Sequence, residues 1–84
     1  MSYHVTLKKS AEKELDAIHG PLLDRIRRKL FVLADNPRPI GVQKLHGQDG
    51  YRIRIGDYRV LYLIDDSTRH VEIISVAHRR NAYR

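Results

Sequence analysis

The residues best suited to chemistry surround a predicted hairpin turn. Gly56-Asp57 separates two strand-like runs, and a glycine at the first central position of a two-residue loop is typical of a type II′ turn. Such a turn fixes the register of its strands, so Arg54 would oppose Arg59, and Arg52 would lie on the same side of the sheet. The sequence therefore predicts three arginines on one sheet face.

Three arginines on one face suit the binding of a phosphodiester. Like charges that oppose each other on neighbouring strands destabilise a sheet, and a bound anion would relieve that cost. Arginine presents a planar fork of donors that matches phosphate oxygens, and the same donors can stabilise the charge that develops during cleavage. The alternative is a solvated face with divergent side chains, and the inference fails if the turn is longer than two residues.

The C-terminal segment adds groups of the same kind. Residues 78–84 contain His78, Arg79, Arg80, Tyr83 and Arg84. Histidine ordinarily titrates near neutrality, so His78 could exchange a proton with a leaving oxygen. Tyr83 could stack on an unpaired base while the arginines hold phosphates, which favours RNA. The alternative is a basic tail at the chain terminus.

Composition agrees with an anionic partner. The 84 residues include 16 Lys and Arg against 10 Asp and Glu, a formal net charge of +6. Nucleic acid is the first candidate, an anionic membrane surface is a weaker one, and a merely soluble basic domain remains open. The chain has no cysteine, no signal-peptide pattern and no apolar run near the roughly 20 residues of a membrane span. We therefore expect a cytoplasmic protein with no membrane partner.

The pattern of apolar residues predicts one α+β domain over residues 1–84. Period-two alternation or apolar runs indicate strands over 3–7, 51–55, 58–64 and 71–77. Helical spacing is found over 10–18, where Ser10 is a candidate N-cap, and over 21–34, where Pro21 suits the first turn. Residues 38–50 are predicted to be an irregular loop anchored by Leu45. The expected order is a strand, a two-helix hairpin and three further strands.

A metal site is not expected. The other histidines lie on different predicted elements without metal-ligand spacing: His4, His19, His46 and His70. Asp65-Asp66 is predicted to be a polar turn, and a metal-dependent hydrolase would need a further acidic partner for this pair.

Three stretches of the sequence form a recognisable pattern, namely Lys44-Leu45-His46-Gly47, Tyr51 to Tyr62, and Val76 to Arg80 with Tyr83. They resemble the C-terminal half of RelE-type toxins, which belong to type II toxin–antitoxin systems. The resemblance is specific over residues 37–84, whereas residues 1–36 agree with the family only in layout. It implies an α+β fold with the helices packed on an antiparallel sheet, and a cognate RelB-like antitoxin that covers the basic face.

The resemblance also implies a reaction. RelE-type enzymes cut messenger RNA in the A site of the 70S ribosome without a metal or cofactor, and 2′-hydroxyl attack leaves a 2′,3′-cyclic phosphate. By position, Arg59 matches the phosphate-binding arginine, Arg79 the arginine that stabilises the leaving group, and Tyr83 the terminal tyrosine. The expected catalytic residues are Arg54, Arg59, His78, Arg79 and Tyr83, and the expected RNA-binding residues are Lys44, His46, Arg52, Arg80 and Arg84.

The sequence departs from the family pattern in two ways. Arg52 and Arg54 stand where the best-known members have lysines, and a guanidinium with a pKa above about 12 is a poor proton acceptor. Arg54 is therefore expected to be an electrostatic clamp, with His78 as the proton acceptor, or Tyr83 if neighbouring arginines lower its pKa. The spacing between Arg79 and Tyr83 is also shorter than in the type enzyme.

Two other functions fit the same residues. A ParE-type gyrase inhibitor would share the fold without cleaving RNA. A non-catalytic RNA-binding module would retain its function after replacement of His78 or Tyr83. A convergent anion site favours the nuclease, because a protein that only docks on gyrase does not need one.

Overall fold

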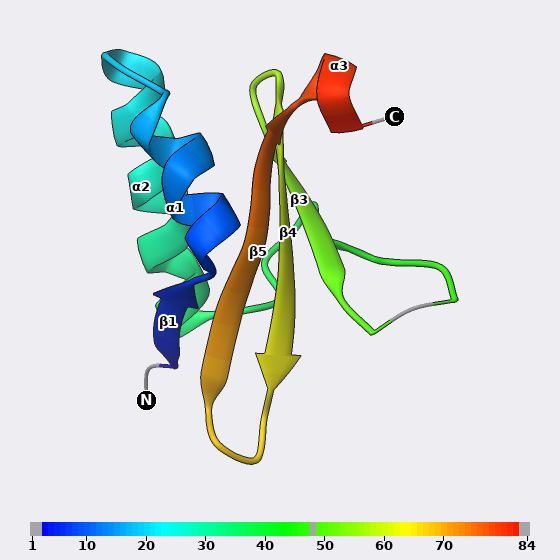
Figure 1. Ribbon diagram of the computed structural model, residues 1–84. Helices are drawn as coiled ribbons and strands as arrows, with labels where there is room; N and C mark the ends of the chain where they lie inside the picture. The colour runs from blue at the N-terminus through cyan, green and yellow to red at the C-terminus, as the bar shows by residue number, and fades with distance from the viewer. Residues whose placement is uncertain (1–2, 48, 83–84) are drawn as a thin grey trace.

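The computed structural model describes residues 3–47 and 49–82, the last two by their backbone alone. Figure 1 shows a strand, two helices and a β-meander that ends in a short helix. In chain order these are β1 (His4–Leu7), α1 (Lys9–Asp16), α2 (Pro21–Asp35), β2 (Gln43–Lys44), β3 (Tyr51–Ile55), β4 (Tyr58–Asp65), β5 (His70–His78) and α3 (Arg79–Ala82). The α+β class and the predicted order of the long elements are confirmed.

The five strands form one mixed sheet in the order β1-β5-β4-β3-β2. β2, β3, β4 and β5 pair antiparallel, whereas β1 pairs parallel with β5, so the expectation of a purely antiparallel sheet is wrong at this edge. No tight turn joins β1 to β5, because the rest of the fold separates them, and a parallel arrangement is therefore possible. The sequence predicts a loop at β2, because its two exposed residues show no period-two alternation of apolar and polar side chains. The structure shows a strand there because these residues pair with β3.

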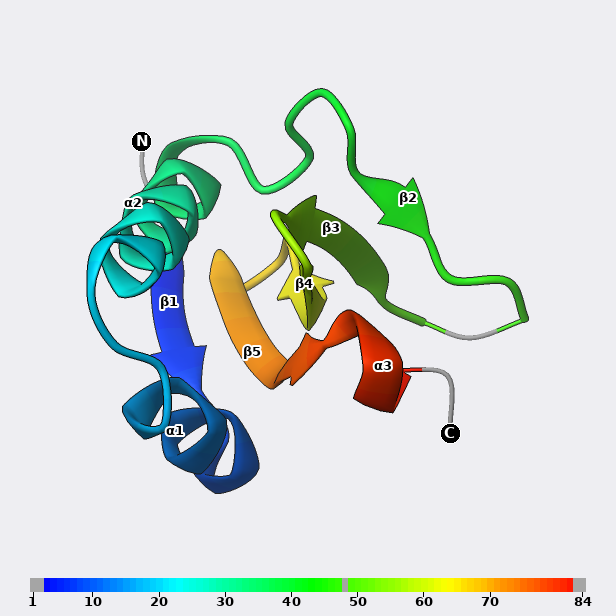
Figure 2. The same cartoon turned by 90° about the horizontal axis from the view of Figure 1, so that it is seen from above.

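Both long helices are amphipathic and pack on one face of the sheet, as Figures 1 and 2 show. α2 begins at Pro21, as predicted, and buries Ile26, Leu30 and Leu33. Sheet residues on the same side complete the core, namely Ile53, Ile55, Val60, Tyr62, Val71, Ile73 and Val76. None of the described helices combines the length and apolar character that crossing a membrane requires.

The start of α1 differs from the prediction. Lys8 occupies the N-cap position and makes no side-chain cap hydrogen bond. Ser10 lies inside the first turn, and its hydroxyl donates to the backbone oxygen of Ile74 at 3.2 Å. The N-cap assignment of Ser10 is therefore wrong, because this hydroxyl fastens α1 to β5 instead of capping the helix.

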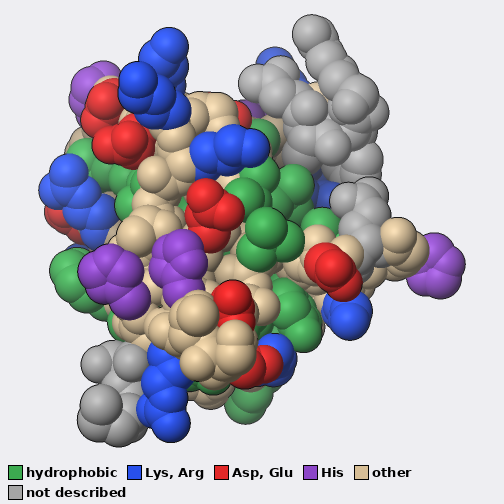
Figure 3. All heavy atoms as spheres, turned by 60° about the horizontal axis from the view of Figure 1, so that its bottom comes forward, with side chains coloured by type: hydrophobic (Ala, Val, Ile, Leu, Met, Phe, Trp, Pro, Cys, Tyr) green, Lys and Arg blue, Asp and Glu red, His purple; other side chains and the backbone are tan. Residues whose placement is uncertain are grey.

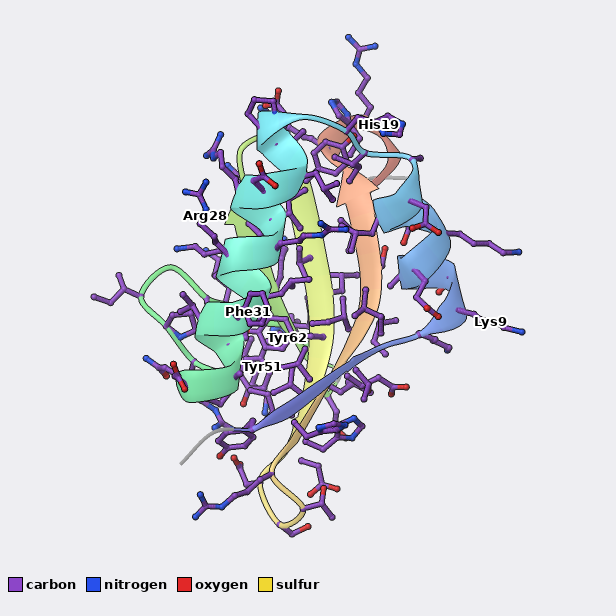
Figure 4. All side chains as sticks on the ribbon, turned by 90° about the vertical axis from the view of Figure 1, so that its left-hand side faces the viewer. Lys9, His19, Arg28, Phe31, Tyr51 and Tyr62 are labelled. Carbon is purple, nitrogen blue, oxygen red and sulfur yellow. The ribbon has the colours of Figure 1, made fainter. Side chains whose placement is uncertain are left out.

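Two stacked tyrosines fill the space beneath the C-terminal half of α2, as Figure 4 shows. The rings of Tyr51 and Tyr62 lie 5.9 Å apart at an angle of 26°, and the Tyr62 hydroxyl donates to the backbone oxygen of Pro37 at 2.8 Å. Burial raises the pKa of Tyr62 to about 12. The hydrogen bond anchors the segment after α2 to the sheet.

Candidate active site

The β3–β4 hairpin positions two of the predicted arginines. Gly56 has a φ of 58° and no positive φ is found at Asp57, which is the pattern of a type II′ turn. Arg54 directly opposes Arg59, as the turn predicts, and the same register pairs Ile55 with Tyr58 and Arg52 with Leu61. Because Ile55 faces the core, Arg54 and Arg59 project from the face of the sheet away from α1 and α2.

A third arginine reaches the same place from the end of β5. The backbone nitrogen of Arg79, the first residue of α3, donates to the backbone oxygen of Asp57 at 2.6 Å. This hydrogen bond ties α3 to the hairpin turn, and Figure 2 shows α3 away from α1 and α2. A hollow of about 170 Å³ opens between these elements, lined by Arg54, Gly56, Asp57, Arg59 and Arg79.

The three guanidinium groups differ in exposure. The side chain of Arg59 is 5% exposed, whereas Arg54 and Arg79 are exposed. Neither Arg54 nor Arg79 forms an ion pair with another residue in the described part of the chain. A buried arginine beside two exposed ones has the chemistry to bind a phosphate group, since the buried group is fixed in place and the exposed groups can close on an anion.

Arg52 and Lys44 do not line this hollow. Arg52 lies on the same face as Arg54 but donates a hydrogen bond to the side-chain oxygen of Gln43 on β2. Lys44 opposes Tyr51, and its Nζ lies 6.0 Å from the centroid of the Tyr51 ring. Arg52 therefore extends the basic surface along the sheet, whereas Lys44 lies at the other end of β3.

His78 is also separated from the hollow. It opposes Tyr58 on β4, and the two rings meet edge to face with centroids 5.2 Å apart. Arg59 opposes Ala77, the preceding residue, so His78 points to the other face of the sheet. The Nδ1 atom of His78 accepts a hydrogen bond from the backbone nitrogen of Arg80 at 3.2 Å. The geometry does not support His78 as a group that acts on an anion in this hollow.

The remaining predicted site residues occupy several positions. His46 is exposed in the loop between β2 and β3, and Arg80 is exposed on α3. Tyr83 and Arg84 lie outside the described residues, so their predicted roles stay predictions. The reasoning from sequence missed Asp57 as a site residue, although its position in the turn before Arg59 was a usable signal.

The opposite end of the sheet has a different electrostatic character. Arg38 donates to both carboxylate oxygens of Asp66 at 2.9 and 3.2 Å, and the Tyr3 hydroxyl donates to the same carboxylate at 2.7 Å. Two hydrogen bonds lower the pKa of Asp66, and the one from the Arg38 guanidinium has a larger effect than the one from the Tyr3 hydroxyl. Figure 3 shows acidic, basic and histidine side chains intermingled at this end. Among the described residues, no group of three or more His, Asp or Glu side chains is arranged to hold a metal ion.

Comparison with known proteins identifies the family. The family model described as the ParE toxin of the type II toxin–antitoxin system parDE matches residues 5–83. Toxin RelE of Mycobacterium tuberculosis is 34% identical over 84 residues, covering 98% of this chain and 87% of that protein.

Two solved complexes contain similar chains. In the archaeal RelE–RelB complex of Pyrococcus horikoshii, the matched chain has a TM-score of 0.84 and 30% identity, with 94% of this chain and 97% of that chain covered. In the RelBE complex of E. coli, the TM-score is 0.80 and the identity 28%, with 92% and 96% covered. This chain belongs to the ParE toxin family of type II toxin–antitoxin systems and is a RelE-like toxin.

Proposed function

We propose that this toxin is a ribosome-dependent endoribonuclease that cuts messenger RNA in the A site of the 70S ribosome. The convergence of Arg54, Arg59 and Arg79 on one hollow is the observation that carries the proposal. These residues come from β3, β4 and α3, and the hairpin register and the Arg79–Asp57 hydrogen bond hold them together. Preorganised cationic donors of this kind can stabilise the charge that develops on a phosphate during cleavage.

The reaction we propose is an internal transfer at phosphorus. The 2′-oxygen forms a bond to the adjacent phosphorus and loses its proton, while the bond from phosphorus to the 5′-oxygen breaks and that oxygen gains a proton. The products are a 2′,3′-cyclic phosphate and a 5′-hydroxyl, and no step is assigned to a metal or cofactor. Arg59 binds the phosphate, Arg54 clamps it electrostatically, and Arg79 stabilises the leaving oxygen.

The proton acceptor requires a different side chain. Guanidinium groups have a pKa above about 12 and do not accept the 2′-proton. His78 lies on the other face of the sheet, against Tyr58. Of the two candidates that the sequence offers, Tyr83 therefore remains, and it would accept the proton as a phenolate favoured by neighbouring arginines.

We further propose that a RelB-like antitoxin inhibits this toxin in the cytoplasm. The chains matched in Pyrococcus horikoshii and E. coli come from a RelE–RelB complex and from a RelBE toxin–antitoxin complex. The net charge of +6 favours a partner with acidic segments. An antitoxin that covers the hollow would exclude RNA from the arginines, which links binding to inhibition.

The test is toeprinting on translating ribosomes with the wild-type protein, Arg59→Ala and the matched control Arg27→Ala. Arg27 is exposed and lies on α2, away from the hollow. We expect cleavage in the A site with a cyclic phosphate on the new end, lost in Arg59→Ala and retained in Arg27→Ala. Intact message, together with gyrase-dependent DNA breaks, would instead support the ParE-type alternative.

A further inference from the structure

A second group of basic side chains lies on α2, outside the hollow. Arg25, Arg28 and Lys29 are spaced three and four residues apart, so they share one flank of the helix. Arg27 lies on the other flank, where it lines an apolar groove together with Tyr3 and with residues of β1, α1 and α2. Figure 4 shows Arg28 on the side of α2 that faces away from α1.

Gly56 joins this flank to the hollow. A Cβ atom at Gly56 would lie 3.6 Å from Nη1 of Arg25 and 3.8 Å from a methyl carbon of Leu22. Gly56 also lines the hollow that Arg54 and Arg59 form on the other face. The turn residue Gly56 therefore lies between the Arg25 guanidinium and the hollow.

The charges on this flank are not neutralised within the described part of the chain. Arg25 and Arg28 are exposed, and neither forms an ion pair with another described residue. Arg25 repels Arg28 and Lys29 at three- and four-residue spacing, whereas Asp24, four residues before Arg28, offsets part of this repulsion. Arg25 and Arg54, neither of which forms an ion pair with another described residue, thus lie on the two sides of the turn at Gly56.

We propose that Arg25 and Arg28 bind backbone phosphates of the RNA strand whose scissile phosphate occupies the hollow. The inference rests on the proposed function, because it assigns the path of that substrate. A basic surface that continues across the turn can follow the backbone of a single strand from one phosphate to the next. The strand would pass over the hairpin tip from the face of Arg54 to the flank of Arg25.

The experiment measures binding of RNA that the enzyme does not cleave. Fluorescence anisotropy would follow the binding of 2′-O-methyl RNAs of three and of twelve nucleotides to wild type, Arg25→Gln, Arg28→Gln and Arg27→Gln. The Arg27→Gln variant is the matched control, since it removes the same charge from the opposite flank of the same helix. Thermal unfolding of each variant verifies that the fold is retained.

The expected result depends on RNA length. Each of Arg25→Gln and Arg28→Gln should weaken binding of the long RNA by roughly two- to fivefold at low salt. Each should also reduce the slope of log affinity against log salt by about 0.7, the value for one phosphate contact on a single strand. Binding of the short RNA should change no more than it does in Arg27→Gln.

Three results would overturn the inference. Equal effects of Arg25→Gln and Arg27→Gln would indicate a general charge effect, and equal effects on both RNA lengths would place Arg25 in the hollow itself. A comparable loss of affinity for ribosomes without message would assign the flank to ribosomal RNA. Cleavage by the wild-type protein is measured in a separate assay. If the nuclease proposal fails but this inference holds, the variants will still show binding effects that depend on RNA length, and wild type will give no cleavage products.

Discussion

Replacement of Arg54 by glutamine should stabilise the toxin while it impairs the site. Arg54 directly opposes Arg59, and the side chain of Arg59 is only 5% exposed, so the Arg59 charge is held in place beside Arg54. Directly opposed like charges on a sheet cost about 0.2–1 kcal/mol. We expect Arg54→Gln to raise the free energy of unfolding by about 0.5 kcal/mol, which is a rise of about 2–4 °C in the melting temperature of a domain this small.

Inorganic phosphate should make the wild-type protein more stable than Arg54→Gln, the reverse of the order expected without phosphate. A ligand present at ten times its dissociation constant stabilises the folded state by about 1.4 kcal/mol. Wild type should gain this stability as phosphate fills the hollow, and Arg54→Gln should gain less because one of the three guanidinium groups is missing. Above a threshold phosphate concentration, wild type should therefore be the more stable protein.

The assay is chemical unfolding at constant ionic strength, with phosphate replacing chloride. Arg27→Gln is the control for charge removal and for the general stabilising effect of phosphate, because Arg27 lies on α2 away from the hollow. A lower stability of Arg54→Gln in chloride would refute the argument that the opposed charges repel. An equal response of all three proteins to phosphate would refute the anion site.

Three further changes test other contacts. Tyr62→Phe should lower the free energy of unfolding by about 1–2 kcal/mol in urea denaturation, because the buried backbone oxygen of Pro37 loses its donor. The pKa of Asp66 is lowered in the folded state. Ionised Asp66 therefore contributes to the free energy of unfolding above the ordinary Asp pKa of about 3.9, and this contribution is lost as the pH falls through the pKa of Asp66 in the folded protein. The free energy of unfolding should thus fall less steeply between pH 6 and pH 2 in Asp66→Asn than in wild type. An equal dependence on pH in the two proteins would show that the ion pair with Arg38 does not contribute to stability. His78→Gln should retain cleavage within tenfold, because His78 faces away from the hollow; a larger loss in an intact fold would restore it as the proton acceptor.

Sequence reasoning succeeded where local chemistry determines the geometry. A two-residue turn with glycine first admits one register, so the sequence alone predicts the pairing of Arg54 with Arg59. The placement of His78 could not be predicted in the same way. The apolar pattern predicts a strand over residues 71–77, whereas β5 continues through His78, and strict alternation then directs that side chain to the other face.

Long-range contacts account for most of the remaining differences. The parallel pairing of β1 with β5 and the ion pair of Arg38 with Asp66 join residues that are distant in the chain. Neither leaves a signal in a local window, because spacing and periodicity report only on neighbours within one element. The burial of Arg59 is a further example, since a strand pattern predicts the face of a side chain but not what covers it.

The two ends of β4 show why the site lies at the hairpin tip. At the Asp66 end, Arg38 is paired with a carboxylate that also accepts from Tyr3, so its charge is already compensated. At the tip, Arg54 opposes a second arginine and forms no ion pair with another described residue. An exposed arginine such as Arg54, placed beside a second arginine, is a candidate for ligand binding, because an anionic ligand supplies a countercharge. Under the proposed function, RNA would bind at the tip, and an antitoxin that covers the tip would be sufficient for inhibition.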